Sequence, residues 1–175
     1  MKVKHFRKAV TMLVICIMLT VYYTAHAQKL FFLFGHALYA SPLEKEFKDT
    51  YKYGIGAEGG AGIGWKKTFI TGTIGYTSFT AETSNVAGKV NSIPIKIGLR
   101  HYLLEKLLYV HGDIGIASIK DEIMSSAQTK FSGDIGTGLK IGGLEVQLDF
   151  DGFSRANPSG YNSWIALKAG FAIGL

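Results

Sequence analysis

The sequence has little cysteine, little proline and no long stretch of helical periodicity. Cys16 is the one cysteine among 175 residues, and Pro42, Pro94 and Pro158 are the three prolines. A single cysteine excludes both a disulfide framework and a zinc site built from several thiolates. From residue 28 onward, apolar residues do not recur at the three- and four-residue spacing of an amphipathic helix, so a helical bundle is not predicted.

The first residues have the pattern of an export signal. Four basic residues precede an apolar run over residues 9–23, and the small residues of Ala25-His26-Ala27 follow it. This order predicts a secretory signal peptide over residues 1–27, cleaved after Ala27. The apolar run is shorter than the ~20 residues that a spanning helix needs, which argues against a membrane anchor.

The charge of the chain changes when that signal is set aside. The whole sequence carries a formal net charge of +6, but the signal contains four of the nineteen basic residues and none of the thirteen acids. The remainder, residues 28–175, has a net charge of only +2 and lacks cysteine. A charge this small does not indicate a nucleic-acid partner, and the length suits one domain.

Apolar and polar residues alternate along most of residues 28–175. Between residues 144 and 153, for example, Leu144, Val146 and Leu148 alternate with Glu145, Gln147 and Asp149. A period of two predicts strands with two different faces. Eight such segments are predicted, at residues 30–40, 51–65, 68–79, 92–102, 108–118, 129–141, 144–153 and 165–175.

The connections between these segments alternate in length. Those after the second, fourth and sixth segments are short ("KK", "LEK", "GG"), whereas the others are longer and polar, as in "SPLEKEFKD" and "TAETSNVAGKVN". Short turns at one end and longer loops at the other are typical of outer-membrane barrels. Segments of this length, when tilted, can cross a bilayer. The prediction is an all-β, eight-stranded, antiparallel up-and-down transmembrane barrel.

The polar faces are expected to point inward. A soluble barrel with an apolar interior, such as a lipocalin, would show the same alternation, but the polar faces carry six cations and six anions, and a narrow interior needs such balance. The predicted lumen charge network comprises Lys52, Glu58, Lys96, Arg100, Asp113, Lys130, Asp134, Lys140, Glu145, Asp149, Asp151 and Lys168.

Aromatic residues near the segment ends are expected to form two interfacial girdles. One girdle is predicted at the short-turn end, from Phe31, Trp65, Phe69, Tyr102 and Tyr109. The other is predicted at the loop end, from Tyr39, Tyr51, Tyr76, Phe79, Phe150 and Trp164.

The stretch "GIGAEG" at residues 54–59 fits the spacing of a dinucleotide-binding turn. That motif requires a buried strand before it and a helix after it. Here a charged stretch precedes it, and glycine and β-branched residues follow. The glycines are therefore interpreted as an inner barrel wall that leaves room for long side chains from the opposite side.

At the level of pattern, the chain resembles the small eight-stranded outer-membrane β-barrel proteins of Gram-negative envelopes, similar to the OmpA and OmpX transmembrane domains and often labelled "porin family". The resemblance rests on phrases such as "YKYGIGAEGGAGIGW", "SIPIKIGLRHYL" and "WIALKAGFAIGL". It implies a location in the cell outer membrane and insertion by the barrel-assembly machinery, usually through a terminal aromatic. Here the sequence ends in Leu175, with Phe171 four residues earlier.

Three functions fit this architecture: a closed barrel that serves envelope integrity or surface interaction through its loops, a narrow porin for small solutes, and a lipid-modifying enzyme. The enzyme would need a serine and a histidine held together, and no spacing links His36, His101 or His111 to Ser92, Ser118 or Ser132. No enzymatic activity, cofactor or metal is therefore predicted. The expected partners are outer-membrane lipid and lipopolysaccharide, the latter through Lys45, Lys48 and Lys89, and the protein is expected to be a monomer.

Overall fold

A computed structural model describes residues 31–82, 88–104, 106–121, 126–155 and 160–174. The predicted signal peptide and Leu175 lie outside these residues. The described chain forms one short helix and eight strands: β1 (Phe31–Pro42), α2 (Lys45–Thr50), β2 (Tyr51–Trp65), β3 (Thr68–Ala81), β4 (Val90–Leu104), β5 (Leu108–Asp121), β6 (Gln128–Ile141), β7 (Leu144–Ser154) and β8 (Tyr161–Gly174).

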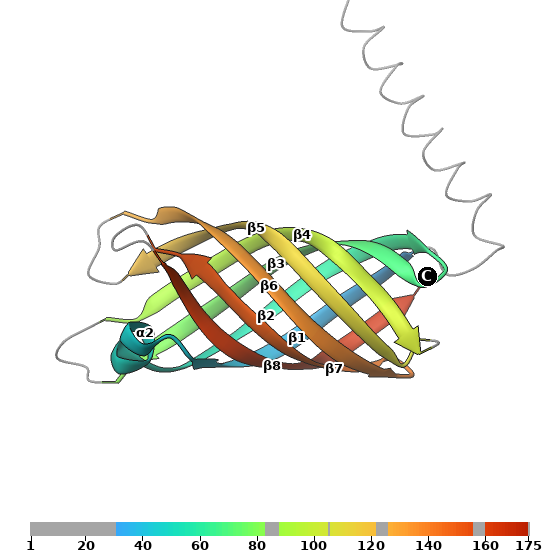
Figure 1. The fold of residues 1–175 in the computed structure, drawn as a ribbon, viewed down its shortest axis with the longest axis horizontal. Coiled ribbons are helices and arrows are strands. Elements are labelled where there is room, and N and C mark those ends of the chain that lie inside the picture. Colours follow the sequence, from blue (N-terminus) through green and yellow to red (C-terminus); the bar gives the residue numbers. More distant parts are fainter. Residues whose placement is uncertain (1–30, 83–87, 105, 122–125, 156–159, 175) are drawn as a thin grey trace, which may run out of the picture.

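The strands form a closed antiparallel barrel in sequence order (Figure 1). Each strand pairs with its neighbour in the chain, and β8 pairs with β1, for example Ala37 opposite Ala169. The eight-stranded up-and-down barrel predicted from the alternation is confirmed. Several strands are longer than predicted because their polar ends, such as Asn91 opposite Lys120, continue the ladder without continuing the hydrophobic alternation.

The barrel is apolar outside and polar inside. On β7, Leu144 and Leu148 are more than half exposed, whereas Glu145 and Asp149 are each only 1% exposed. Isoleucine, leucine, valine and phenylalanine side chains project outward in the same way on all eight strands. Such an exterior suits lipid rather than water. No helix in the described ranges has the length and apolarity to cross a bilayer, and this observation does not bear on spans made by strands.

The glycines of β2 do form part of the inner wall, but their neighbours differ from those predicted. A Cβ atom added at Gly62 or Gly60 would overlap the ring of Phe32 or Phe34 from β1. Glycines that make room for charged side chains lie on other strands, since a Cβ at Gly98 would meet the carboxylate of Asp113. The β2 glycines therefore accommodate adjacent aromatic rings rather than long charged side chains from across the barrel.

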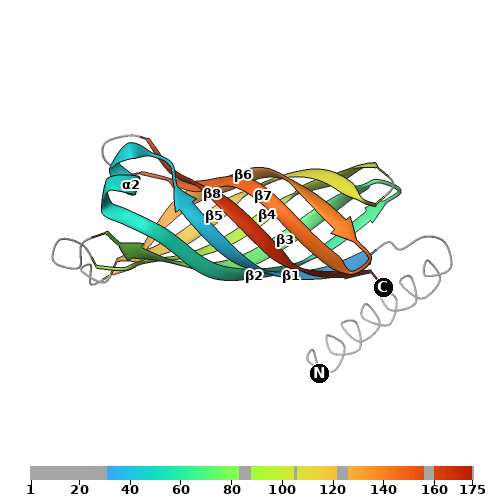
Figure 2. The ribbon, with the colours of Figure 1, turned by 90° about the horizontal axis from the view of Figure 1, so that it is seen from below.

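Helix α2 was predicted only as loop. The side chain of Glu44 caps it by accepting a hydrogen bond from the backbone N–H of Phe47 at 3.0 Å, and the Thr50 hydroxyl donates to the carbonyl of Glu46 at 2.8 Å. Only Phe47 of this helix is buried. Figure 2 shows α2 at the end of the barrel opposite the chain's C-terminus. The helix thus presents one aromatic side chain to the loop-side opening of the barrel.

Candidate functional site: the barrel interior

The interior consists of a central charge network between two aromatic clusters. The loop-end cluster consists of Leu38, Ala40, Phe47, Tyr51, Phe79, Val90, Phe153, Trp164 and Ala166. The turn-end cluster consists of Phe32, Phe34, Phe69, Tyr102, Tyr109 and Ala172. The central network consists of His36, Glu58, Lys96, Arg100, His111, Asp113, Asp134, Glu145, Asp149, Asp151 and Lys168.

Two buried lysines each join two carboxylates from different strands. Lys168 Nζ lies 2.7 Å from Glu58 Oε2 and 2.8 Å from Asp149 Oδ2. Lys96 Nζ lies 2.6 Å from Asp134 Oδ2 and 2.8 Å from Asp151 Oδ1. These contacts connect strands across the bore as well as adjacent ones. The lysines therefore cross-link the wall while neutralising charges that would be very costly alone.

Arg100 connects the central network to the turn-end cluster. Its Nη1 donates to Glu145 Oε1 at 2.9 Å. Its guanidinium carbon lies 4.2 Å from the centre of the Tyr109 ring and 4.8 Å from that of Phe32. A guanidinium on aromatic faces adds cation–π attraction to its ion pair. Arg100 thus links the charge network directly to the aromatic layer.

Two histidines complete the central network. His36 places Nδ1 3.1 Å from Glu58 and Nε2 3.1 Å from Glu145. His111 places Nδ1 2.9 Å from Asp113 and Nε2 2.9 Å from Asp149. Ionised carboxylates only accept hydrogen bonds, so this geometry is satisfied by rings that donate from both nitrogens. The network contains six acids but only three lysine and arginine residues, Lys96, Arg100 and Lys168. Two histidines in that form offset two of the three excess negative charges.

Little space remains among these side chains. A cavity lined by residues that include Glu58, Arg100, His111 and Lys168 has a volume of about 10 Å³. That is room for about one water molecule. The centre of the bore is therefore a packed layer of cross-linked side chains.

Nine of the twelve lysine, arginine and acidic residues predicted for the lumen lie in the central network. The other three do not. Lys130 and Lys140 are partly exposed and line cavities at the loop end and the turn end respectively. The prediction for Lys52 was wrong: it is exposed, because a register shift between Tyr51 and Tyr53 reverses the faces at the start of β2 and turns Tyr51 inward.

His36 was missing from the predicted network, as were its neighbour Gln147 and Thr71, whose hydroxyl donates to Asp113 at 2.9 Å. His36 has the same parity along β1 as the inward-facing Phe32 and Phe34. A continuous apolar run at the start of this segment hid that parity. The faces of β1 could not be assigned from those of its neighbour β2 either, because a single sequence does not show which residues of two strands pair.

The predicted aromatic girdles are only partly correct. Trp65, Tyr39, Tyr76 and Phe150 are outward-facing and 43–71% exposed. Phe69, Tyr102 and Tyr109 instead belong to the turn-end cluster, and Tyr51, Phe79 and Trp164 to the loop-end cluster. Each lies on the inward face of its strand. Six of the eleven residues predicted for the girdles therefore point into the bore.

The serine and histidine residues considered for catalysis do not form a pair in the described part of the chain. His36 and His111 contact carboxylates, and exposed His101 shares a hydrogen bond with the Thr68 hydroxyl at 2.9 Å. Ser132 donates to the carbonyl of Gly152. Catalysis by a serine requires a base within hydrogen-bond reach, and none of these contacts supplies one.

One group of side chains has the spacing of a metal site. Ligand atoms of His111, Asp113 and Asp134 lie within 4.8 Å of one another. These carboxylates already accept hydrogen bonds from Thr71 and from Lys96. The cluster is part of the central network.

No protein-family model matches the sequence, and no curated protein matches it. Solved structures do. The outer membrane protein Ail of Yersinia pestis, in a phospholipid bilayer nanodisc, aligns with a TM-score of 0.57 and 13% identity over 81% of this chain and 99% of that one. Neisserial surface protein A aligns with a TM-score of 0.57 and 12% identity over 83% and 97% of the two chains.

The N-terminal β-barrel domain of Pseudomonas aeruginosa OprF aligns with a TM-score of 0.57 and 13% identity over 81% of this chain and 97% of that one. The chain has the fold of the small eight-stranded outer-membrane barrels. Each alignment covers nearly the whole of the other chain, so the likeness concerns the entire barrel. At sequence identities this low, the similarity concerns the fold and not the residues of the interior.

Proposed function

We propose that this protein is a monomeric integral barrel of the Gram-negative outer membrane, with a closed lumen, that serves envelope integrity or surface interaction through its loops. The apolar exterior and the fold support the membrane location, together with the export signal predicted for residues 1–27. By the usual arrangement of such barrels, the long loops and α2 face the outside and the short turns face the periplasm.

The central network is the observation that carries the closed-lumen proposal. Eight strands enclose an interior only wide enough for side chains to fill. Here the filling comprises ion pairs of 2.6–2.8 Å around Lys96 and Lys168, placed between two aromatic clusters. An ion crossing the bore would have to separate these pairs and pass both clusters.

Single-channel recording tests this proposal. The protein is refolded into a planar bilayer, and a heat-dependent shift on a detergent gel shows that the barrel has formed. We expect no steady conductance from the folded sample. Steady conductance from an equally folded sample would make the protein a narrow porin and overturn the closed-lumen proposal.

Lipopolysaccharide is the proposed partner at the loop end. Lys45 and Lys48 are exposed on α2, and Lys89 is exposed just before β4. Phosphate groups are recognised by such ammonium groups as point charges, and the attraction weakens with salt. We expect replacement of all three by glutamine to lower lipopolysaccharide affinity and its salt dependence. Removing the turn-end charges Lys66, Lys67 and Lys106 is the matched control; equal losses in both variants would remove the proposal.

The barrel-assembly machinery is the proposed partner during insertion. The aromatic nearest the end of β8 is Phe171, which faces outward and is 60% exposed. We expect Phe171→Ala to slow the appearance of the heat-modifiable form in cells, while refolding in detergent keeps its normal rate. An unchanged rate in cells would show that Phe171 is not the recognised residue.

A further inference from the structure

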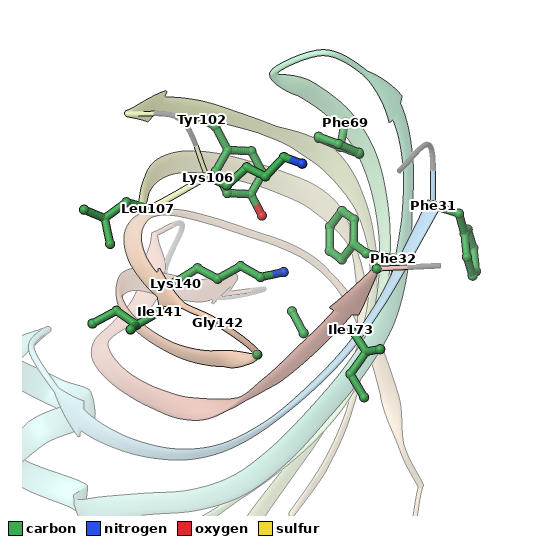
Figure 3. A pocket seen from close by; sticks show the side chains of 13 residues that line it. Phe31, Phe32, Phe69, Tyr102, Lys106, Leu107, Lys140, Ile141, Gly142 and Ile173 are labelled. Carbon is green, nitrogen blue, oxygen red and sulfur yellow. The ribbon is translucent and has the colours of Figure 1, made fainter. Parts of the chain in front are cut away.

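The turn end of the bore contains a cavity that lies outside the central network. Its volume is about 680 Å³. Phe32, Phe69 and Tyr102 of the turn-end cluster line it, and Lys106 and Lys140 extend into it (Figure 3). The volume falls within the ~300–1,000 Å³ typical of small-molecule sites.

The aromatic floor separates this cavity from the central network. The Phe32 and Phe69 rings meet edge to face with centroids 5.3 Å apart, and the Phe69 and Tyr102 rings do so at 5.9 Å. All three residues are at most 7% exposed. Beyond them the lining combines small residues, such as Gly142, Gly143 and Ala172, with larger apolar ones such as Leu107, Ile141 and Ile173. An apolar recess of this volume therefore remains beside the three rings.

Two lysines supply the charged side chains among the described lining of the recess. Lys106 is exposed in the connection between β4 and β5, and Lys140, on β6, is partly exposed with its Nζ 5.9 Å from the centre of the Phe32 ring. The described residues that line the cavity include no aspartate or glutamate. An apolar floor with two ammonium groups beside it is complementary to a molecule that has an alkyl chain and an anionic head.

We propose that this cavity binds one medium-chain fatty carboxylate. The carboxylate pairs with Lys106 and Lys140, and the alkyl chain lies on Phe32, Phe69 and Tyr102. A single chain is favoured over a two-chain phospholipid because an eight-stranded barrel holds at most one small ligand. The proposal goes beyond the closed barrel and does not depend on it, since the aromatic floor lies between the cavity and the central network.

An NMR titration of the protein in phosphatidylcholine nanodiscs tests this site, with decanoate as the probe. We expect saturable shifts of the Gly142, Gly143 and Ala172 amide resonances. We expect none at Ala40, which lies in the loop-end cluster, or at Leu148, which faces outward. Decanol, which has no charge, and acetate, which has no chain, should bind at least about tenfold more weakly, because each lacks one half of the complementarity.

Two double variants separate the site from general charge effects. Lys106→Gln/Lys140→Gln should weaken decanoate binding about five- to tenfold, whereas Lys66→Gln/Lys67→Gln, in the neighbouring β2–β3 turn, should leave it unchanged. Equal affinity in both variants, or parallel shifts at Leu148, would show simple partitioning into lipid and overturn the proposal. Phosphatidylglycerol nanodiscs that shift Gly142 and Ala172 without decanoate, and leave decanoate no further effect, would also overturn it by identifying a lipid headgroup as the occupant.

Discussion

The two ends of the bore have the same aromatic chemistry but different degrees of closure. At the loop end, Phe47 from α2 enters the cluster, with its ring centroid 5.0 Å from that of Phe79 and 6.1 Å from that of Trp164. At the turn end, every member of the cluster comes from a strand, and the cavity beside it has a volume of about 680 Å³, compared with about 360 Å³ for the cavity beside the loop-end cluster. At both ends the strand residues form an aromatic layer, and at the loop end a side chain from outside the strands, Phe47, packs on top of it.

This difference follows from the lengths of the connections. The two-residue turn between β6 and β7 contains Gly142 and Gly143, which have no side chain to fold over the opening. The longer β1–β2 connection can form a helix and return a phenylalanine to the axis. The aromatic cover of the loop-end cluster is therefore a property of α2, whereas the central network lies between the two clusters.

The largest expected effect comes from breaking the layer that the two ends share. Lys168→Met leaves the carboxylates of Glu58 and Asp149 buried without their common cation. Removing one partner of a buried ion pair costs about 3–5 kcal/mol. We expect this loss of unfolding free energy in urea titrations of the protein in detergent, followed by the gel shift.

The matched control is Lys130→Met, which removes a partly exposed cation at the loop-end rim. Surface pairs contribute about 0–1 kcal/mol, so this variant should unfold close to the parent. Equal midpoints for the two variants would mean that the central network is not what holds the wall together.

Removing one ring from each cluster compares the two ends directly. Phe79 is fully buried and contacts Phe47, Tyr51 and Trp164, whereas Phe69 borders the turn-end cavity. Phenylalanine-to-alanine changes in cores cost about 3–5 kcal/mol. We expect Phe79→Ala to fall within that range and Phe69→Ala below it, because a ring beside a void has fewer contacts to lose. Urea unfolding of both variants measures the difference, and the reverse order would show that the turn end is the better packed.

The strands, their antiparallel order and most of the central network could be predicted because period-two alternation encodes both the strand and its faces. For Lys96, Arg100 and Asp149 the polar position alone identified an inward direction. The end clusters could not be predicted in the same way. An aromatic residue near a strand end is equally compatible with a lipid girdle and with an inner plug, and parity decides only where the alternation is clean.

Lys52 and Phe47 show two further limits. The register shift between Tyr51 and Tyr53 is a backbone irregularity with no hydrophobic signature, so Lys52 was placed on the wrong face. The helix containing Phe47 has six residues, too few to show helical periodicity. It is stabilised by the cap from Glu44 and by the tertiary packing of the Phe47 ring, and neither feature produces a periodic pattern in the sequence.

Phe47→Ala should make the loop end resemble the turn end. The strand-borne rings would remain, with a void where the phenylalanine had been, and the central network would still block the bore. We expect a stability loss of about 1–2 kcal/mol, smaller than for a strand residue because α2 can detach locally. In a Trp65→Phe background, Trp164 emission should shift to the red while bilayer conductance stays absent. Unchanged emission would show that Phe47 does not shield Trp164.

The smallest expected effect is a pH dependence of this helix. The backbone N–H of Phe47 donates to the Glu44 carboxylate, and this hydrogen bond holds the pKa of Glu44 below its usual value. A lowered pKa means that the carboxylate stabilises α2 fully above the ordinary glutamate pKa of about 4.3, and that this contribution is lost as the pH falls through the lowered pKa.

Hydrogen exchange at the Phe47 amide, corrected for its intrinsic pH dependence, should therefore lose protection on acidification. Glu44→Gln keeps an oxygen that can accept the bond but cannot titrate, so its protection should vary less with pH. Because Arg155 also pairs with Glu44 and Glu46, only the difference between the parent and this variant reports on the cap. Parallel pH profiles for the two proteins would assign any loosening of α2 to its other charged groups.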